Sequence, residues 1–177
     1  MFDLKTSVEV ASETALISLS DVKSHLYITH SDDDTYLTTL IGKARKQLEK
    51  FTSRAIGAQT KIWTVDLEGG KEYQIPYNPV NSVSSVTVKT DIGEYTAQTN
   101  ETDYEIEGEF DKIFRCFESG RYKITYTCGY STIPDDLKQA ILCQIAYLYE
   151  NRGDQNKQGL SEISKGLAEQ FIDYSWT

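Results

Sequence analysis

The spacing of apolar residues changes twice along this chain, and that change constrains the fold more than any other feature. Between residues 58 and 128, segments such as "TKIWTVDLEG", "VSSVTVKT" and "RYKITYTCGY" alternate or are rich in β-branched and aromatic residues. This pattern is typical of short strands. On both sides, apolar residues recur every three or four positions, as in amphipathic helices. The sequence therefore predicts an α+β fold, a four-helix body (two N-terminal and two C-terminal helices) with a central antiparallel β-rich insertion.

Four parts follow from this pattern. We expect an extended N-terminal arm over 1–16, a first helical half over 17–57, the β-rich insertion over 58–128 and a second helical half over 129–177. A chain of 177 residues suits one domain, with or without a large insertion. The insertion has room for roughly five to seven short strands. Its alternation predicts an inward face made by Trp63, Val86, Val88, Ile124 and Tyr126.

The first helix is predicted within "ISLSDVKSHLYI". Ser18 and Asp21 have the spacing of a capping box, and Ile17 can pack on Val22 as a hydrophobic staple.

The three aspartates of "SDDDTYL" allow two interpretations. In an EF-hand loop that starts at Asp32, Leu37 would replace the required glycine and Lys43 the required glutamate, which argues against a metal site. At a helix start, the carboxylates would instead complement the positive end of the helix dipole. We therefore expect a helix from about Asp33, capped by Ser31 or Asp32.

The third helix is expected to begin at Pro134 and to stop near Gly153, with "DQNKQG" as a polar, mobile loop after it. A last helix is predicted over 161–176. One face of this helix would carry the apolar residues Leu160, Ile163, Leu167, Phe171 and Tyr174.

The charge pattern argues against a surface that grips nucleic acid. The net charge is −9, and none of the segments 1–58, 59–128 and 129–177 is basic, with −1, −5 and −3 respectively. Binding to phosphates needs Lys and Arg. The longest apolar stretch, "AILCQIAYLY", is too short to cross a bilayer, and the N-terminus does not resemble a signal peptide. We expect a soluble protein, made in a cytoplasm and without a membrane partner.

Reactive side chains do not form a recognisable constellation in the sequence. Cys116, Cys128 and Cys143 show no metal-ligand spacing and are interpreted as free thiols, and His25 and His30 have no nearby second ligand. The carboxylates of "EIEGEFD" alternate with apolar residues, as on the wet face of a strand. The sequence thus predicts no enzyme, no metal and no cofactor, although a site assembled only by tertiary folding stays open.

The order of these landmarks resembles the head–tail connector (adaptor) proteins of long-tailed bacteriophages and prophages. The resemblance covers about residues 17–153 and rests on "FTSRA" at 51–55, "PYNPVNSVSSVTV", and "GYSTIP" leading to "YENR" at 149–152. Ser53 stands where the family often has glycine, and Tyr77-Asn78 lies between the two prolines of the turn.

This resemblance implies a structural virion protein at the head–tail interface, without catalysis or cofactor. It would form a ring, typically of twelve subunits, under the portal protein, and would offer a platform to stopper or tail-completion proteins. DNA would pass through the ring without specific binding. Twelve copies at −9 give roughly −100 charges, part of which would line the channel. Two other functions stay open: a DNA-packaging accessory protein and a small cytoplasmic enzyme.

Two sets of residues are candidates for contacts. The C-terminal segment would bind the portal through Leu167, Phe171, Ile172, Tyr174 and Trp176, or would instead close the subunit's own bundle. Arg54 and Arg152 stand near helix ends and would act either as partners of the helix dipole or in salt bridges within or between subunits.

Overall fold

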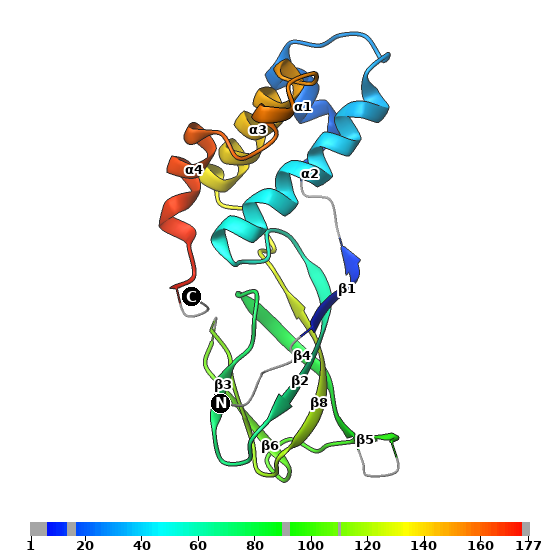
Figure 1. Cartoon of the computed structure of the whole chain (residues 1–177), viewed down its shortest axis with the longest axis vertical. Helices are drawn as coiled ribbons and strands as arrows, with labels where there is room; N and C mark the ends of the chain where they lie inside the picture. The colour runs from blue at the N-terminus through cyan, green and yellow to red at the C-terminus, as the bar shows by residue number, and fades with distance from the viewer. Residues whose placement is uncertain (1–6, 14–16, 90–92, 110, 175–177) are drawn as a thin grey trace. The chain divides into compact units, whose positions relative to one another are not determined.

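A computed structural model describes residues 7–13, 17–89, 93–109 and 111–174 of the chain (Figure 1). Two compact units are present. The β-rich unit comprises the described residues of 1–14 and 57–129, and the helical unit comprises those of 15–56 and 130–174. The predicted α+β class, with helices on both sides of a strand-rich region in the sequence, is confirmed.

A five-stranded sheet forms the larger part of the β-rich unit, in the order β1-β2-β8-β4-β5. Each neighbouring pair is antiparallel, and Figure 1 shows β2, β8 and β4 side by side. These strands are β1 (Ser7–Glu13), β2 (Gln59–Leu67), β4 (Val80–Lys89), β5 (Tyr95–Ala97) and β8 (Gly120–Cys128). Residues 7–13 of the predicted arm are therefore an edge strand of this sheet, and the remainder of the predicted arm lies outside the described residues.

A second, three-stranded sheet has the order β3-β7-β6, again antiparallel. Its strands are β3 (Glu72–Gln74), β6 (Tyr104–Glu107) and β7 (Ile113–Cys116). Phe114 stands at its centre, fully buried, with a stacked contact to Tyr104 (5.3 Å between ring centroids) and an edge contact to Tyr122 of β8 (5.7 Å). Aromatic contacts of this kind join the core of one sheet to the other.

The predicted inward face of the strands is right at four of its five positions. Trp63, Val86, Ile124 and Tyr126 are at most 2% exposed. Val88 is only half-buried and is the exception. It lies next to the last residue of β4, where a side chain has fewer neighbours than in the middle of a sheet.

One buried residue of β2 was not foreseen. Lys61 is 3% exposed, and its ammonium lies 4.0 Å from the centroid of the Tyr77 ring, close enough for a cation–π interaction. Strand alternation places Lys61 on the same face as Trp63, so the sequence pattern does indicate that Lys61 points inward. It is not included in the predicted inward face because charged residues are rarely buried.

The helical unit contains α1 (Leu19–Leu26), α2 (Asp34–Thr52), α3 (Asp135–Glu150) and α4 (Glu162–Ala168), with short 3-10 turns η1 (Gln155–Lys157) and η2 (Glu169–Phe171). Figure 1 shows α2 and α3 alongside each other. The apolar side chains that recur at helical spacing in the sequence are buried between these helices. The core of the unit comprises Ile17, Val22, Leu37, Leu40, Ala44, Leu48, Ile56, Leu137, Ala140, Ile141, Leu142, Ile145, Leu148 and Ala168.

The starts of α1 and α2 agree with prediction, α2 to within one residue, but the predicted cap of α2 is wrong. Both hydrogen bonds of the Ser18–Asp21 capping box are present. The N-cap of α2 is Asp33, not Ser31 or Asp32, and its side chain makes no cap hydrogen bond. The carboxylates serve tertiary contacts instead: Asp34 accepts a hydrogen bond from Lys23 at 2.7 Å, and Asp33 binds residues of the distant α3 region.

The predicted last helix is also shorter than expected. It ends at Ala168, the chain tightens into η2, and Ile172 is extended. Two hydrogen bonds to residues at the end of α2 stabilise this turn. Arg54 Nε donates to the carbonyl of Phe171 (2.8 Å), and the N–H of Asp173 donates to the carbonyl of Thr52 (2.8 Å). The apolar spacing continues through the turn with Leu167, Phe171 and Tyr174, so the end of the helix at Ala168 could not be predicted from this spacing.

Candidate interaction surfaces

The C-terminal segment divides into a packed part and an exposed part. Leu160, Leu167 and Phe171 pack against the core of the helical unit. Ile163 and Tyr174, predicted on the same face, are each 68% exposed. Ile172 is half-buried, and Trp176 lies outside the described residues. The exposed aromatic surface of this segment is therefore concentrated after the turn η2.

A buried amide fixes the entry into this segment. Gln144 of α3 is fully buried, and its Nε2 donates to Gln47 Oε1 (2.9 Å) and to the carbonyl of Gly159 (2.8 Å). Its Oε1 accepts from the N–H of Ser161 (2.8 Å). Ser161 in turn caps α4 by accepting from the N–H of Ser164. The Gln144 side chain of α3 thus binds the Gly159 carbonyl and the Ser161 N–H, which lie just before α4, and also contacts Gln47 of α2.

The predicted mobile loop before α4 is held by the same region. Gln158 accepts from Lys43 Nζ through its side chain and from Gln47 Nε2 through its carbonyl, both at 2.6 Å. Its own Nε2 donates to the carbonyls of Asn151 and Asp154. The sequence predicted a polar, mobile loop here, and its polar composition gave no indication that Gln158 has hydrogen-bond partners on α2.

Arg152 lies in a cluster with Asp33, Tyr36 and Tyr149. Its guanidinium is 3.3 Å from Asp33 Oδ1 and lies over the rings of Tyr36 (4.4 Å) and Tyr149 (4.7 Å). The Tyr149 hydroxyl donates to Asp33 Oδ2 at 2.7 Å. In this structure Arg152 therefore forms an ion pair within its own subunit, which connects the start of α2 to the end of α3.

Asp33 and Tyr149, which share a hydrogen bond in this cluster, shift each other's pKa. The Tyr149 hydroxyl, and after it Arg152, lower the pKa of Asp33, because both stabilise the carboxylate. The same hydrogen bond raises the pKa of Tyr149. Asp33 is thus a charged anchor that nothing in its sequence position distinguished from Asp32.

Arg54 follows the end of α2 and supports the C-terminal segment through the Phe171 carbonyl. Ser53, the C-cap of α2, has a left-handed backbone with φ of 56°. Glycine adopts this conformation without steric cost, which gives a physical reason for glycine as the residue that the connector family often has here.

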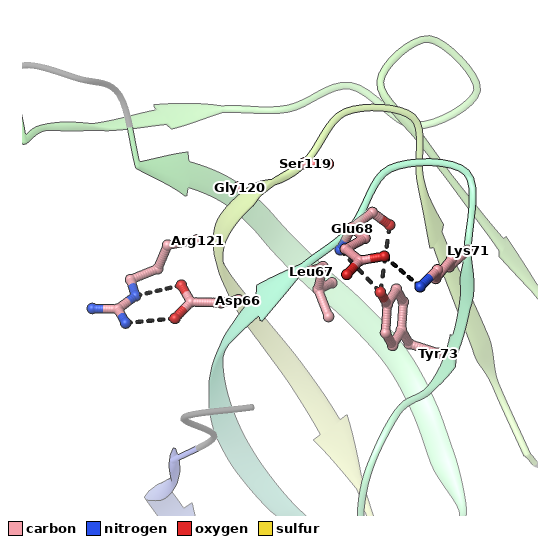
Figure 2. Close-up of a pocket in the computed structure, with 8 residues that line it drawn as sticks. All are labelled: Asp66, Leu67, Glu68, Lys71, Tyr73, Ser119, Gly120 and Arg121. Carbon is pink, nitrogen blue, oxygen red and sulfur yellow. Dashed lines mark hydrogen bonds and ion pairs between the residues drawn. The ribbon is translucent and has the colours of Figure 1, made fainter. Parts of the chain in front are cut away.

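A hollow lies at one end of β2 and β8 in the β-rich unit (Figure 2). Asp66 and Arg121 are cross-strand partners, and the guanidinium makes two hydrogen bonds of 2.7 Å to the carboxylate. Asp66 raises the pKa of Arg121. On the other side Lys71 pairs with Glu68, whose N–H donates to the Tyr73 hydroxyl at 2.9 Å.

Chemically, this hollow offers little reactivity. Its charged side chains neutralise one another, and Ser119 Oγ accepts a hydrogen bond from the N–H of Gly69. Gly69 is required sterically, since a Cβ there would lie 2.5 Å from the Phe117 carbonyl oxygen. The polar groups thus serve to close the turn and the strand ends, and they suit packing better than catalysis.

Cysteines, histidines and carboxylates do not converge elsewhere in the described chain. Cys116 and Cys128 are buried, Cys143 is partly buried, and all three are free thiols. Burial raises the pKa of the Cys116 thiol, which keeps it protonated and unreactive. Among the described residues, no group of three or more His, Cys, Asp or Glu side chains could hold a metal ion. None of the helices in the described ranges is both long enough and apolar enough for a membrane span.

The sequence profile of the family described as head completion protein matches residues 15–162. The chain belongs to this family. The match spans both units, and it confirms the expected relationship to phage head–tail connectors. No curated protein matches the chain at a significant level.

Solved structures of gene transfer agent (GTA) particles share the fold. A chain from the neck of an empty GTA particle, computed with C6 symmetry, superposes with a TM-score of 0.78 at 18% identity, over 94% of this chain and 95% of that chain. A chain from the neck of a native GTA particle, computed with C12 symmetry, gives 0.73 at 21% identity, over 94% of each chain. At these identities the likeness establishes the fold.

Proposed function

We propose that this chain is a structural adaptor that assembles as a ring beneath the portal protein of a phage-like particle, at the junction of head and tail. The observation that carries the proposal is the family match over residues 15–162. The shared fold with neck proteins in particles of C6 and C12 symmetry supports a ring, with twelve copies as the expected number. The ring would extend the DNA channel and present a platform to a stopper or tail-completion protein.

No catalytic step is part of this function. The side chains described above hold segments of the subunit together: Gln144 fixes the connection to α4, and the Asp33–Arg152 cluster joins α2 to α3. A rigid subunit suits an adaptor, because a ring repeats any error in subunit geometry at each interface.

The C-terminal segment is the proposed contact with the portal. Leu167 and Phe171 pack this segment against the helical unit, and Ile172 is half-buried. Tyr174 and Trp176 would then make the contact itself. Tyr174 is 68% exposed, and exposed aromatic residues of this kind become energetic anchors when a partner buries them.

The acidic character of the chain fits a channel through which DNA slides. Its net charge of −9 would leave the ring strongly negative, and a negative wall does not retain phosphates. Tight, salt-sensitive DNA binding by the isolated protein would contradict this part of the proposal.

Native mass spectrometry of the purified chain, alone and mixed with its portal protein, tests the function. A complex of the portal ring with a ring of this chain is expected. A chain that stays monomeric and ignores the portal would contradict the proposal.

Three single variants test the portal contact. Tyr174→Ala should leave the thermal stability of the subunit nearly unchanged and weaken portal binding. Leu167→Ala should lower stability, because Leu167 packs against the core. Equal portal affinity of Tyr174→Ala, Trp176→Ala and wild type would remove the C-terminal segment as the contact.

A further inference from the structure

One face of α2 combines a row of lysines with a glycine. Together with Gln47, five residues line a shallow hollow on the surface of the helix: Thr39, Gly42, Lys43, Lys46 and Lys50. Lys43, Lys46 and Lys50 are three and four residues apart, and Gly42 lies three residues after Thr39 and four before Lys46. Residues at this spacing share one side of a helix. We call these five residues the lysine face.

The lysine face differs from the other cations of the helical unit in its partners. Lys43 donates to the amide oxygen of Gln158, while Lys46 and Lys50 are exposed and have no carboxylate partner within the described ranges. Arg54 donates to a backbone carbonyl. Each remaining cation of the unit contacts a carboxylate, namely Lys23, Arg45, Lys138, Arg152, Lys157 and Lys165.

Like charges three and four residues apart destabilise a helix, so this face is unfavourable in the isolated subunit. An acidic surface placed against it would remove the repulsion. The lysine face is therefore better suited to an interface than to permanent exposure.

Gly42 gives an independent indication of close approach. It stands in the interior of α2, where glycine is a poor helix former, and a Cβ at this position would meet no atom within 4 Å. The packing of the subunit as described gives no reason for a glycine here. A missing side chain at the edge of the lysine face, four residues before Lys46, leaves backbone and room for a partner to come close.

The chain itself carries a surface of the opposite charge. In sequence, the β-rich unit has 8 basic and 15 acidic residues, a net charge of −7, against 10 and 12, or −2, for the helical unit. Residues 101–111 contain six carboxylates and no basic residue. Glu107 and Glu109 in this segment are exposed.

We propose that the lysine face of α2 binds the acidic β-rich unit of a neighbouring copy, around residues 101–111. The inference rests on the proposed ring. A closed ring has a head-to-tail interface in which two different patches of the same chain meet, and these two patches are complementary in charge. Duplex DNA is the rival partner for lysines, but a chain of net charge −9 repels phosphates outside this one face.

Cross-linking in isotopically mixed assemblies tests the contact directly. Equal amounts of ¹⁵N-labelled and unlabelled full-length chain are assembled with the portal, treated with a zero-length carbodiimide and digested for mass spectrometry. Links of Lys46 or Lys50 to a carboxylate within 101–111 are expected in heavy–light pairs. Links found only within one copy, or their absence in intact rings, would overturn the inference.

Charge reversal tests whether the contact drives assembly. The double variant Lys46→Glu and Lys50→Glu should assemble about tenfold less tightly or worse, and addition of Glu107→Lys and Glu109→Lys to the same chain should restore assembly. The control is Lys157→Glu with Lys165→Glu, which changes the net charge by the same amount outside the lysine face. Circular dichroism confirms that each variant is folded.

The outcomes separate the inference from the proposed function. Wild-type rings whose assembly is indifferent to the reversal at Lys46 and Lys50 would overturn the inference and leave the adaptor function intact. Absence of any wild-type ring, with or without portal, would overturn both. Duplex DNA binding by the wild type that the reversal abolishes, measured by fluorescence anisotropy, would assign the lysine face to phosphates and overturn the inference.

Discussion

The helical unit and the β-rich unit each bury an apolar core, but they hold the segments around that core with different side chains. In the β-rich unit, tyrosines both fill the core and make hydrogen bonds that hold the segments around it. Tyr126 is fully buried and its hydroxyl donates to the carbonyl of Pro76, while Tyr122 is 1% exposed and donates to the carbonyl of Glu118, each at 2.9 Å. Burial raises the pKa of Tyr122 to about 12, so its hydroxyl remains a donor at neutral pH.

In the helical unit most residues perform only one of the two tasks, with Tyr149 as an exception, since it packs against the core and donates to Asp33. The core is almost entirely aliphatic, and the connections are bound by polar side chains with no part in the apolar stripe, such as Gln144, Arg54 and Glu49. The apolar pattern of the sequence therefore predicts the β-rich unit more completely than the helical unit. In the β-rich unit, residues that belong to the apolar pattern also make the hydrogen bonds that hold neighbouring segments.

The largest effect is expected in the β-rich unit from Val86→Asp. Val86 is 2% exposed and faces Ile124 across the strands, so an aspartate would bury an unpaired charge. We expect a loss of about 3–5 kcal/mol in the free energy of unfolding, measured by urea titration. The neighbouring exposed Ser85→Asp should change it by less than about 0.5 kcal/mol. Equal stability of both variants would show that the inward face was assigned wrongly.

In the helical unit, Gln144→Ala should have the next largest effect. The variant leaves the Gly159 carbonyl and the Ser161 N–H without their side-chain partner, which we expect to cost roughly 1–3 kcal/mol. Gln139→Ala on the exposed side of α3 is the control. If both variants unfold at the same urea concentration, polar side chains do not hold this unit and the contrast between the units fails.

A pH dependence should distinguish Asp33 from Asp32. Because the pKa of Asp33 is lowered in the folded chain, its carboxylate stabilises the fold above the unfolded value of about 4. That contribution is lost as the pH falls through the folded pKa.

We therefore expect Asp33→Asn to lower the melting temperature at pH 7, with a smaller difference from wild type at pH 3. Asp32→Asn should follow the wild type, since the Asp32 carboxylate is 90% exposed. A difference at Asp33 that does not change with pH would rule out the carboxylate as its source.

The smallest expected effect is a gain in stability, from Ser53→Gly. Ser53→Gly places at the left-handed C-cap of α2 the residue that adopts this backbone without strain, and should stabilise the chain by about 0.5–1 kcal/mol. Ser24→Gly within α1 should instead destabilise by about 0.5 kcal/mol. Thermal unfolding checks both, and a loss at Ser53 would mean that its side chain contributes more than its backbone costs.

By itself, the sequence determined the fold class, the order of helices and strands from residue 17 onward, the capping of α1 and the family. Each of these depends on residues near one another in the chain: apolar spacing, the Ser18–Asp21 pair, and motifs in a fixed order. Local spacing of this kind is readable in one dimension because helices and strands repeat with known periods.

Tertiary structure decided where the last helix ends, which of three aspartates is an anchor, and that the stretch before α4 is held in place. Each depends on a partner far away in sequence: Arg54 for the Phe171 carbonyl, Tyr149 for Asp33, Gln47 for Gln158. Amide, carboxylate and carbonyl groups have no periodic signature, and which of them pair is known only when folding brings distant segments together.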